Sequence, residues 1–188
     1  MKKIIAIIMA VLSLFMFTAC ESESEVGTYN IEMSVKDFGI IKLQLDGSAA
    51  PITVENFVNL VNDGFYDGLT FHRIISGFMI QGGDPEGTGM GGSENKIKGE
   101  FAINGYDNPI SHKRGVISMA RQSYPYDSAS SQFFICHEDC TQLDGQYAAF
   151  GHVTEGMEVV DKIAAVKTDA NDYPLEKVVI EYIKVIED

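Results

Sequence analysis

The sequence predicts a mostly β domain in which a closed antiparallel β-barrel is capped by two α-helices. Stretches of alternating apolar and polar residues recur along the chain, and segments rich in glycine, proline, asparagine and serine separate them. That pattern is typical of short strands joined by tight connections. Only two stretches place apolar residues at helical spacing. Many short strands with so few helices favour a closed barrel.

The chain begins with a targeting segment rather than with the fold. Lys2 and Lys3 precede an apolar run over residues 4–17, and small residues then lead into Cys20. The run is too short for a comfortable transmembrane helix and has the flanks of a secretory signal. The pattern resembles a bacterial lipoprotein box, so we expect a signal peptide over 1–19 and a lipid on Cys20. An ordinary secretory signal and an uncleaved anchor are the alternatives.

Residues 20–27 form a short acidic tether between that cysteine and the domain, which we expect over 28–188. Such a chain would be an exported, membrane-anchored lipoprotein of the cell envelope, on its periplasmic or extracellular face. The membrane is then a partner, through the lipid on Cys20. The formal net charge of −13 repels phosphate backbones and excludes nucleic acid as a partner.

The domain is predicted to open with a hairpin and a helix. Apolar residues alternate over 28–35 and again over 40–45, and a turn that ends at Gly39 separates the two stretches. This alternation predicts a β-hairpin. The next apolar residues fall at helical spacing over 51–63, where Pro51 suits the first turn of an amphipathic helix.

A second hairpin and a long loop come next. Residues 69–75 and 78–83 have the pattern of strand, turn and strand. The glycine-rich segment 84–100 lacks the Gly-Lys-Ser/Thr sequence of a phosphate-binding loop, and no strand-to-helix arrangement surrounds it. We therefore expect a solvated surface loop, with a phosphate site as the weaker alternative.

The rest of the domain is predicted as short strands, one helix and a closing strand. The helix covers 156–166, where apolar residues again fall at helical spacing, and an alternating strand over 177–187 ends the domain. The short strands are expected over 100–103, 115–120, 131–136 and 147–154.

The stretch 71–84 places an arginine among apolar residues. Arg73 is followed within eight residues by Phe78, Met79 and Gln81, and glycines bend the backbone on both sides. A half-buried cation is costly without a partner. The stretch therefore indicates a shaped apolar site with one strong donor, whose partner we expect to be the substrate.

Several motifs occur together along the domain. They are FHRIISGFMIQGGD at 71–84, GVISMAR at 115–121, SSQFFIC at 130–136, LDG at 143–145 and FGHVTEGMEVVDKI at 150–163. Together they resemble the cyclophilin family of peptidyl-prolyl cis–trans isomerases, most of all its bacterial branch, over residues 29–187. The resemblance implies an eight-stranded antiparallel barrel capped by two helices. It also implies an enzyme that rotates X-Pro bonds in proline-containing polypeptides.

The resemblance also implies which residues form the site. Arg73 and Gln81 match the family's catalytic positions. The substrate-binding positions fall on Phe78, Met79, Ala120, Arg121, Gln132, Phe134, Leu143 and Tyr147. Gln142 stands where the best-known members carry a tryptophan that matters chiefly for cyclosporin, so strong inhibition by that compound is not expected. Tyr147 stands where eukaryotic members carry a histidine, and its hydroxyl can still donate to a substrate.

Rotation of an X-Pro bond neither makes nor cleaves a covalent bond, so it requires no nucleophile, metal or cofactor. The sequence agrees, since it has no nucleophile elbow, zinc signature or dinucleotide fingerprint. Arg73 can donate to a twisted amide more strongly than to a planar one. We therefore predict a monomeric isomerase that assists the folding of exported proteins. The alternatives are a proline-binding module or holdase with little turnover, and a structural surface lipoprotein.

Two cysteines remain besides Cys20. Cys136 ends a predicted buried strand and Cys140 lies in a loop, so free thiols are expected for both. Export would allow a disulfide between them. The Cys-x-x-x-Cys spacing with His137 inside also suggests a metal, but a structural zinc site needs four ligands and no second pair is visible. The four histidines share no ligand spacing and are expected to be structural or solvated.

Overall fold

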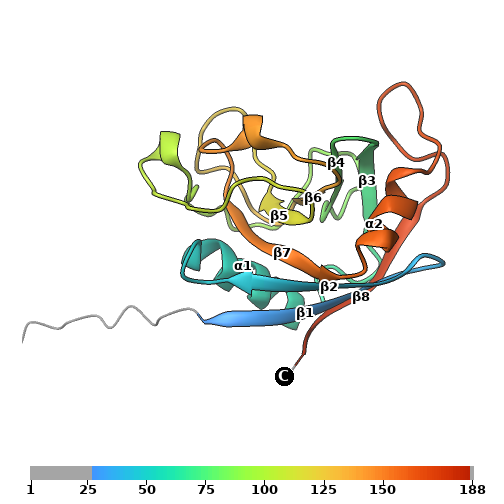
Figure 1. Ribbon diagram of the computed structural model, residues 1–188, viewed down its shortest axis with the longest axis horizontal. Coiled ribbons are helices and arrows are strands. Elements are labelled where there is room, and N and C mark those ends of the chain that lie inside the picture. The colour runs from blue at the N-terminus through green and yellow to red at the C-terminus, as the bar shows by residue number, and fades with distance from the viewer. Residues whose placement is uncertain (1–26, 187–188) are drawn as a thin grey trace, which may run out of the picture.

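The computed structural model describes residues 27–186, which form a closed antiparallel barrel of eight strands with two α-helices (Figure 1). The strands are β1 (Thr28–Val35), β2 (Gly39–Asp46), β3 (Thr70–Ile75), β4 (Met79–Gly82), β5 (Val116–Met119), β6 (Phe133–Cys136), β7 (Ala149–Glu155) and β8 (Val178–Ile186). The helices are α1 (Pro51–Asn62) and α2 (Met157–Ala164), and the 3₁₀ turns are η1 (Ala102–Asn104) and η2 (Thr141–Leu143). Around the barrel the strands follow the order β1-β2-β7-β5-β6-β4-β3-β8.

The predicted fold class, a closed eight-stranded antiparallel barrel with two helices, is confirmed. Most elements begin and end within two residues of the predicted bounds. The predicted signal peptide, Cys20 and all but the last residue of the tether lie outside the described residues. In the described part, neither helix is long and apolar enough to cross a membrane.

The first hairpin shows how alternation in the sequence builds the barrel wall. In the register of β1 and β2, Ile31 lies opposite Leu43 and Met33 lies opposite Ile41. All four side chains are buried in the core, while the residues between them face outward, because successive side chains of a strand point to opposite faces.

Aromatic side chains fill the core between the barrel and α1. The Phe57 ring of α1 lies with its centroid 5.0 Å from Tyr66, 5.6 Å from Phe133 and 5.2 Å from Phe150. Figure 1 shows α1 and α2 at opposite ends of the barrel. Side chains therefore occupy the interior, as in other small barrels, and a substrate must bind on the outer surface.

The strand predicted over 100–103 is wrong, because this segment turns a polar side chain inward. Glu100 is fully buried, and its carboxylate accepts hydrogen bonds from the backbone N–H groups of Ile52 (3.0 Å) and Thr53 (2.8 Å). The Thr53 hydroxyl donates a third bond, at 2.7 Å. The chain then turns into η1 instead of pairing with a neighbouring strand.

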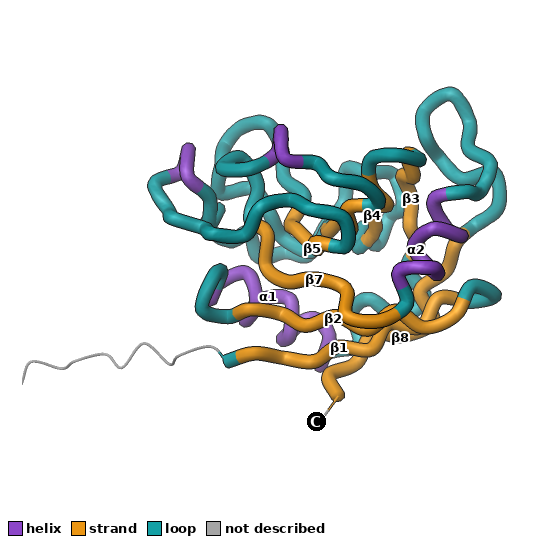
Figure 2. Tube along the Cα trace, viewed as in Figure 1, coloured by secondary structure: helices purple, strands orange, loops and turns teal. Residues whose placement is uncertain are grey.

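The glycine-rich loop after β4 is organised around one buried carboxylate. The Asp84 side chain accepts backbone N–H groups from Glu86, Thr88, Gly89 and Gly91. Burial acts to raise the pKa of Asp84, but these donors outweigh it and lower the pKa below its ordinary value. Figure 2 shows this loop and the other long loops gathered over the half of the barrel that contains β3 to β6. They build up the surface on which a site can form.

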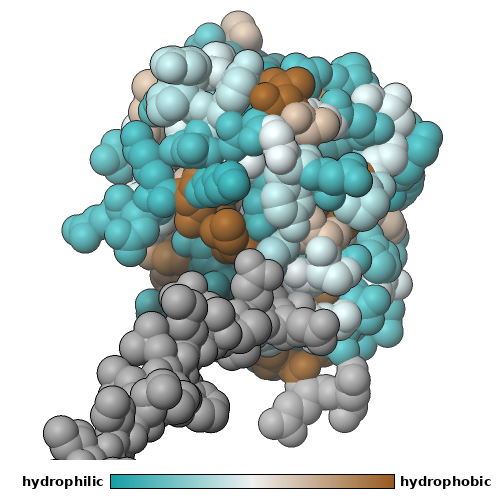
Figure 3. Space-filling view, turned by 90° about the vertical axis from the view of Figure 1, so that its left-hand side faces the viewer, coloured by the Kyte–Doolittle hydropathy of each residue, from teal (hydrophilic) through white to brown (hydrophobic). Residues whose placement is uncertain are grey.

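The surface of the domain carries scattered apolar side chains. On the face in Figure 3, hydrophobic residues form small patches separated by hydrophilic ones. The exposed large hydrophobic residues come from separate elements and are Ile40, Ile52, Met90, Ile103, Tyr124, Leu175 and Val185. Exposed apolar residues that stand singly are normal on protein surfaces.

Candidate active site

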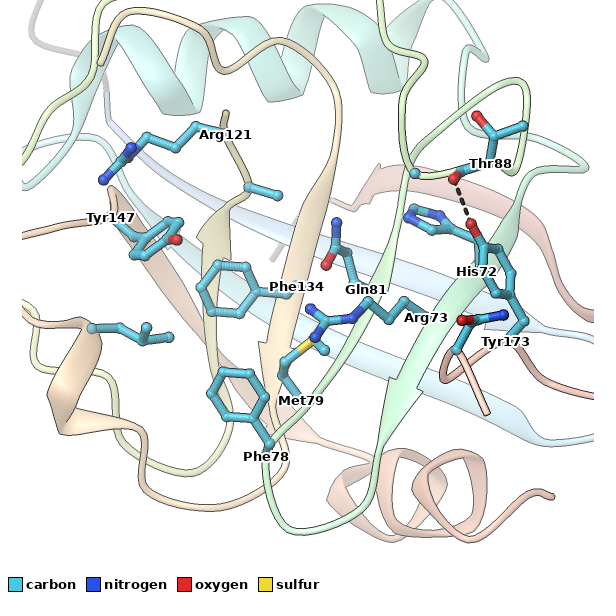
Figure 4. Close-up of a pocket in the computed structure, with 14 residues that line it drawn as sticks. His72, Arg73, Phe78, Met79, Gln81, Thr88, Arg121, Phe134, Tyr147 and Tyr173 are labelled. Carbon is cyan, nitrogen blue, oxygen red and sulfur yellow. Dashed lines mark hydrogen bonds between the residues drawn. The ribbon is translucent and has the colours of Figure 1, made fainter. Parts of the chain in front are cut away.

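A cavity of about 410 Å³ lies against the outer face of the barrel, where β3, β4 and β6 meet the loops (Figure 4). Of the ten residues predicted for the site, nine line this cavity. They are Arg73, Phe78, Met79, Gln81, Ala120, Arg121, Phe134, Leu143 and Tyr147. Residues that are up to 74 positions apart in the chain thus converge on one concave surface.

Strand register explains how the central residues meet. Arg73 of β3 lies opposite Gln81 of β4, and Gln81 lies opposite Phe134 of β6. The row continues to Ser118 of β5, which pairs with Phe134. Directly paired residues point to the same face of a sheet. The three strands therefore present one arginine, one glutamine and one phenylalanine side by side on the outer face.

The outer face of β6 is itself buried, which makes an apolar floor for the cavity. Phe133 and Ile135 point into the barrel core, whereas Phe134 and Cys136 belong to a second apolar cluster outside it. The same cluster contains Met79, and it packs against partly buried side chains from the loops, including Phe78 and Leu143. A strand buried on both faces requires a continuous apolar run, and FFIC supplies it.

These side chains form a cup beside a cationic donor. Phe134 and Met79 are almost fully buried, and the Tyr147 ring meets Phe134 edge to face with centroids 5.8 Å apart. Figure 4 shows the Arg73 guanidinium directed across the cavity toward Phe134, between Gln81 and Met79. The site can therefore enclose a small apolar ring and offer N–H donors at its edge.

Arg73 has a partner within the chain, contrary to the expectation that only the substrate would pair with it. The Arg73 Nε atom lies 3.5 Å from the Asp172 Oδ2 atom, and the two side chains are 42% and 41% exposed. Asp172 belongs to the loop between α2 and β8. Among the described residues Asp172 is the one ion-pair partner of Arg73, so the guanidinium keeps donors for a ligand.

Gln132 is the one predicted residue that does not line the cavity. It lies in an adjoining groove of about 480 Å³, and its side-chain oxygen accepts a hydrogen bond of 2.8 Å from the Gln81 amide. Its own amide donates to the backbone carbonyls of Gly89 (3.1 Å) and Gly91 (2.7 Å). Gln132 therefore connects Gln81 to the glycine-rich loop.

The match to known proteins agrees with this geometry. A family model described as "Cyclophilin type peptidyl-prolyl cis-trans isomerase/CLD" matches residues 30–185, nearly all of the described domain. The chain belongs to the cyclophilin family. It is therefore a peptidyl-prolyl cis–trans isomerase, an enzyme that interconverts the two isomers of X-Pro bonds.

Bacterial relatives are among the similar proteins. A peptidyl-prolyl cis-trans isomerase of Helicobacter pylori is 50% identical over 127 residues, covering 66% of this chain and 74% of the relative. Peptidyl-prolyl cis-trans isomerase A of Dickeya dadantii is 41% identical over 194 residues, covering 98% of each protein.

A crystal structure of a cyclophilin-type isomerase from Cryptosporidium parvum, determined in the presence of the dipeptide Ala-Pro, superposes with a TM-score of 0.78. That chain is 31% identical, and the match covers 85% of this chain and 99% of the other.

In this cyclophilin the Arg121 side chain supports the rim of the cavity. Its guanidinium carbon lies 4.9 Å from the Phe101 ring centroid, 5.1 Å from Tyr126 and 4.7 Å from Tyr147. Its Nε atom donates to the Gln146 carbonyl at 2.9 Å. Contacts of this kind hold a cation in place through ring electrostatics. Arg121 therefore fixes Tyr147, the residue that stands where eukaryotic relatives carry a histidine.

Five further residues line the cavity and were not predicted. They are His72, Thr88, Gly89, Asn171 and Tyr173. The Tyr173 hydroxyl donates to the Thr88 carbonyl, so the loop before β8 and the glycine-rich loop close one side of the cavity together (Figure 4). Neither loop carries a periodic pattern of apolar residues, so sequence patterns could not place their side chains. Strand alternation would place His72 on the face opposite Arg73. The pairing of β3 with β4 is irregular between Phe71 and Arg73, so no sequence pattern predicted His72 in the cavity.

A buried histidine links two walls of the cyclophilin cup. The His112 Nδ1 atom lies 2.9 Å from Asp144 Oδ1, and the Nε2 atom lies 2.9 Å from the Ser118 hydroxyl. Its ring stacks on Phe134 with centroids 6.0 Å apart. Asp144 directly follows Leu143, so His112 connects the Phe134 side of the cup to the Leu143 side. Burial lowers the pKa of His112, although hydrogen bonding to Asp144 acts to raise it.

We expect acid to destabilise the protein partly through His112. Its pKa in the folded protein lies below the ordinary value, so the unfolded chain takes up the proton first as the pH falls. The stability that the neutral ring contributes is complete above about pH 6.5 and is lost as the pH falls toward the folded pKa. Urea titrations across this range should show a weaker pH dependence of the free energy of unfolding in His112→Gln. The difference should be at most about 1.4 kcal/mol per pH unit, the value for one proton.

The control for this measurement is His152→Gln, because His152 is exposed. That variant should keep the pH dependence of the wild-type protein. His72, whose pKa burial also lowers, remains in both variants and contributes equally to them. The same pH dependence in His112→Gln and the wild type would rule out the contribution of His112.

Cys136 and Cys140 are free thiols, as expected, and both are buried. The Cys140 sulfur lies 3.2 Å from the Phe78 carbonyl oxygen and 3.1 Å from that of Glu138. Burial raises the pKa of each thiol above its ordinary value. Both cysteines therefore act as apolar packing beneath the cup, since the thiolate is the reactive form.

Proposed function

We propose that this isomerase accelerates the rotation of X-Pro bonds in other exported proteins while tethered to a membrane by a lipid on Cys20. The isomerase activity is that of the family, and the tethering rests on the order of segments at the N-terminus. A charged n-region, an apolar run and small residues lead into Cys20, and an acidic spacer connects it to the domain. Folding of exported chains is slow where a proline must change isomer, so an isomerase at the membrane assists it.

The observation that supports catalysis best is the donor beside the apolar cup. Amide resonance gives the peptide bond a rotational barrier of about 18–20 kcal/mol. When the bond twists, the proline nitrogen regains a lone pair, and Arg73 can donate to it or to the rotating carbonyl. This bond is stronger in the twisted state than in the planar state, which is the condition for lowering the barrier.

The cup fixes one end of the rotating bond. We assign the proline ring to the apolar surface of Phe78, Met79, Phe134 and Leu143, which line one cavity with Arg73. With the ring held, the residue before proline can turn. Gln81, Ala120 and Tyr147 line the same cavity, so we assign the rest of the bound peptide to them.

The activation free energy of rotation has to be lowered by only a moderate amount. Shortening a step of tens of seconds to milliseconds takes roughly 10⁴-fold, or about 5.5 kcal/mol. A hydrogen bond to a charged group contributes about 1.5–3 kcal/mol. Orientation of the ring and peptide has to supply the remaining few kcal/mol, which is well within the range known for positioning effects. All these residues belong to one chain, so we propose that a monomer is sufficient.

Changing the lipidation residue tests the tether. Cys20→Ser removes the thiol that would carry the lipid, so we expect the protein to stay unprocessed or to be released from membranes. Cell fractionation with size analysis of the processed chain measures this. Cys140→Ser provides the control, because Cys140 lies buried beneath the cup and the variant should fractionate as the wild-type protein does. A Cys20→Ser protein of full processed size in the membrane fraction would overturn the lipoprotein assignment.

The role in folding can be tested in the same cells. An exported protein whose folding is limited by a proline should reach its native state more slowly when Arg73→Ala replaces the wild-type isomerase. The Cys20→Ser protein, active but untethered, separates the contribution of location from that of catalysis. Equal folding rates in the presence of wild type and Arg73→Ala would show that isomerisation by this protein does not serve exported chains.

A further inference from the structure

The loop between α2 and β8 is more ordered than its position suggests. Residues Thr168 and Pro174 form an isolated bridge, and the Leu175 N–H donates to the Lys167 carbonyl at 2.9 Å. The tip of this small hairpin is tightened by the Asp169 carboxylate, which accepts the N–H groups of residues 171 and 173 at 2.8 and 3.0 Å. The loop therefore holds a defined conformation by its own hydrogen bonds.

The tip of the hairpin is attached to the catalytic strand. The Ile74 N–H of β3 donates to the Asp172 carbonyl at 2.9 Å, one residue beyond Arg73. On the other side, the Tyr173 hydroxyl donates to the Thr88 carbonyl of the glycine-rich loop. The backbone of residue 172 is thus held between two parts of the site, which places its side chain beside Arg73.

The backbone at Asp172 is unusual for a residue with a side chain. Its φ of 67° lies in the left-handed region, which residues other than glycine, asparagine and aspartate seldom adopt. Strained conformations of this kind occur preferentially at functional sites. Here the conformation places a carboxylate oxygen 3.5 Å from the Arg73 Nε atom.

We infer that Asp172 is a positioning residue for Arg73, an inference that rests on the proposed role of Arg73 in catalysis. The Nε atom is the guanidinium nitrogen nearest the backbone, so a carboxylate there leaves the two terminal nitrogens facing the cup (Figure 4). The Gln81 side-chain nitrogen donates to the Gln132 oxygen, which holds the Gln81 side chain in place beside the guanidinium. Asp172 thus orders the Arg73 guanidinium before the substrate binds. Less conformational entropy of this side chain is then lost on reaching the transition state.

The expected effect is modest because both side chains are about 40% exposed. Exposed ion pairs are weakened by water and salt, so removing the charge should lower kcat about threefold to fivefold. Loss of an interaction that acts mainly in the transition state should leave KM within about twofold of the wild-type value. In the wild-type protein, kcat should fall toward that of the variant as salt is added, because salt screens the pair.

The variant Asp172→Asn isolates the charge. Asparagine also tolerates the left-handed conformation, so the hairpin should keep its shape while the ion pair is lost. Glu176→Gln is the matched control, since it removes one carboxylate from an exposed position of the same loop, whereas Arg73 pairs with Asp172. A coupled peptide assay should show the loss of kcat and its salt dependence in Asp172→Asn and not in Glu176→Gln.

Combining Asp172→Asn with Arg73→Ala separates this inference from the proposed catalytic role. If Asp172 acts through Arg73, the second substitution should change nothing further in the Arg73→Ala background. An equal loss in both backgrounds, an equal loss in Glu176→Gln, or an unchanged kcat in Asp172→Asn would each overturn the role of Asp172. Full activity of Arg73→Ala alone would instead overturn the catalytic role of the arginine itself.

Discussion

Replacing Arg73 with alanine is expected to lower kcat/KM for a proline peptide at least tenfold while the fold stays intact. The substitution removes the N–H donors that face the apolar cup, and with them a charged hydrogen bond made most strongly to the twisted amide. Such a bond contributes about 1.5–3 kcal/mol, which corresponds to roughly tenfold to more than a hundredfold in rate. A coupled proline-isomerisation assay with residues 21–188 measures the effect.

The fold is not expected to depend on Arg73. Its one ion pair among residues 27–186, with Asp172, is about 40% exposed, and exposed pairs contribute at most about 1 kcal/mol. Urea denaturation of the variant should therefore resemble that of the wild-type protein. Arg73→Lys serves as the matched control, because it keeps the charge and loses the planar fork of donors. We expect intermediate activity from it, and wild-type turnover by Arg73→Ala would disprove the mechanism.

The barrel was predictable because each strand carries its own signal. In β1 and β2 the alternation of buried and exposed residues determines both the strand and its register. In the other half of the barrel, the register of β3, β4 and β6 brings Arg73, Gln81 and Phe134 into one row. The residues of the cup followed from the resemblance of their motifs to a known family. Their positions along the chain did not reveal that they lie in the same cavity.

Interactions made by loops were not predictable in the same way. Asp172 lies 99 positions beyond Arg73, and its position depends on a hairpin held by hydrogen bonds of Asp169 and Tyr173 that have no periodic pattern. The strand predicted over 100–103 was wrong for a related reason. Alternation assigns Glu100 to a surface position, but a buried group 47 positions away in the chain pairs with it. Local sequence cannot report such a partner.

Glu100 completes the N-terminus of α1, which has no cap of its own. The N-cap residue is Ala50, whose side chain cannot accept a hydrogen bond. Pro51 has no N–H group, and the Val54 N–H donates to the Ala50 carbonyl at 2.9 Å. The remaining N–H groups of the first turn, from Ile52 and Thr53, donate to the Glu100 carboxylate. One side chain therefore satisfies a helix terminus that is mostly buried.

We expect Glu100→Ala to lower the free energy of unfolding by about 3–4 kcal/mol, because it leaves the N–H and hydroxyl groups of Thr53 buried without an acceptor, each at a cost of about 1–3 kcal/mol. Glu100→Gln keeps one acceptor oxygen and should lose about half as much. Urea denaturation followed by circular dichroism measures both. Glu100 does not line the cavity, so each variant should retain wild-type kcat/KM under conditions where it is folded. A loss below about 1 kcal/mol in Glu100→Ala would mean that water replaces the carboxylate at the helix terminus.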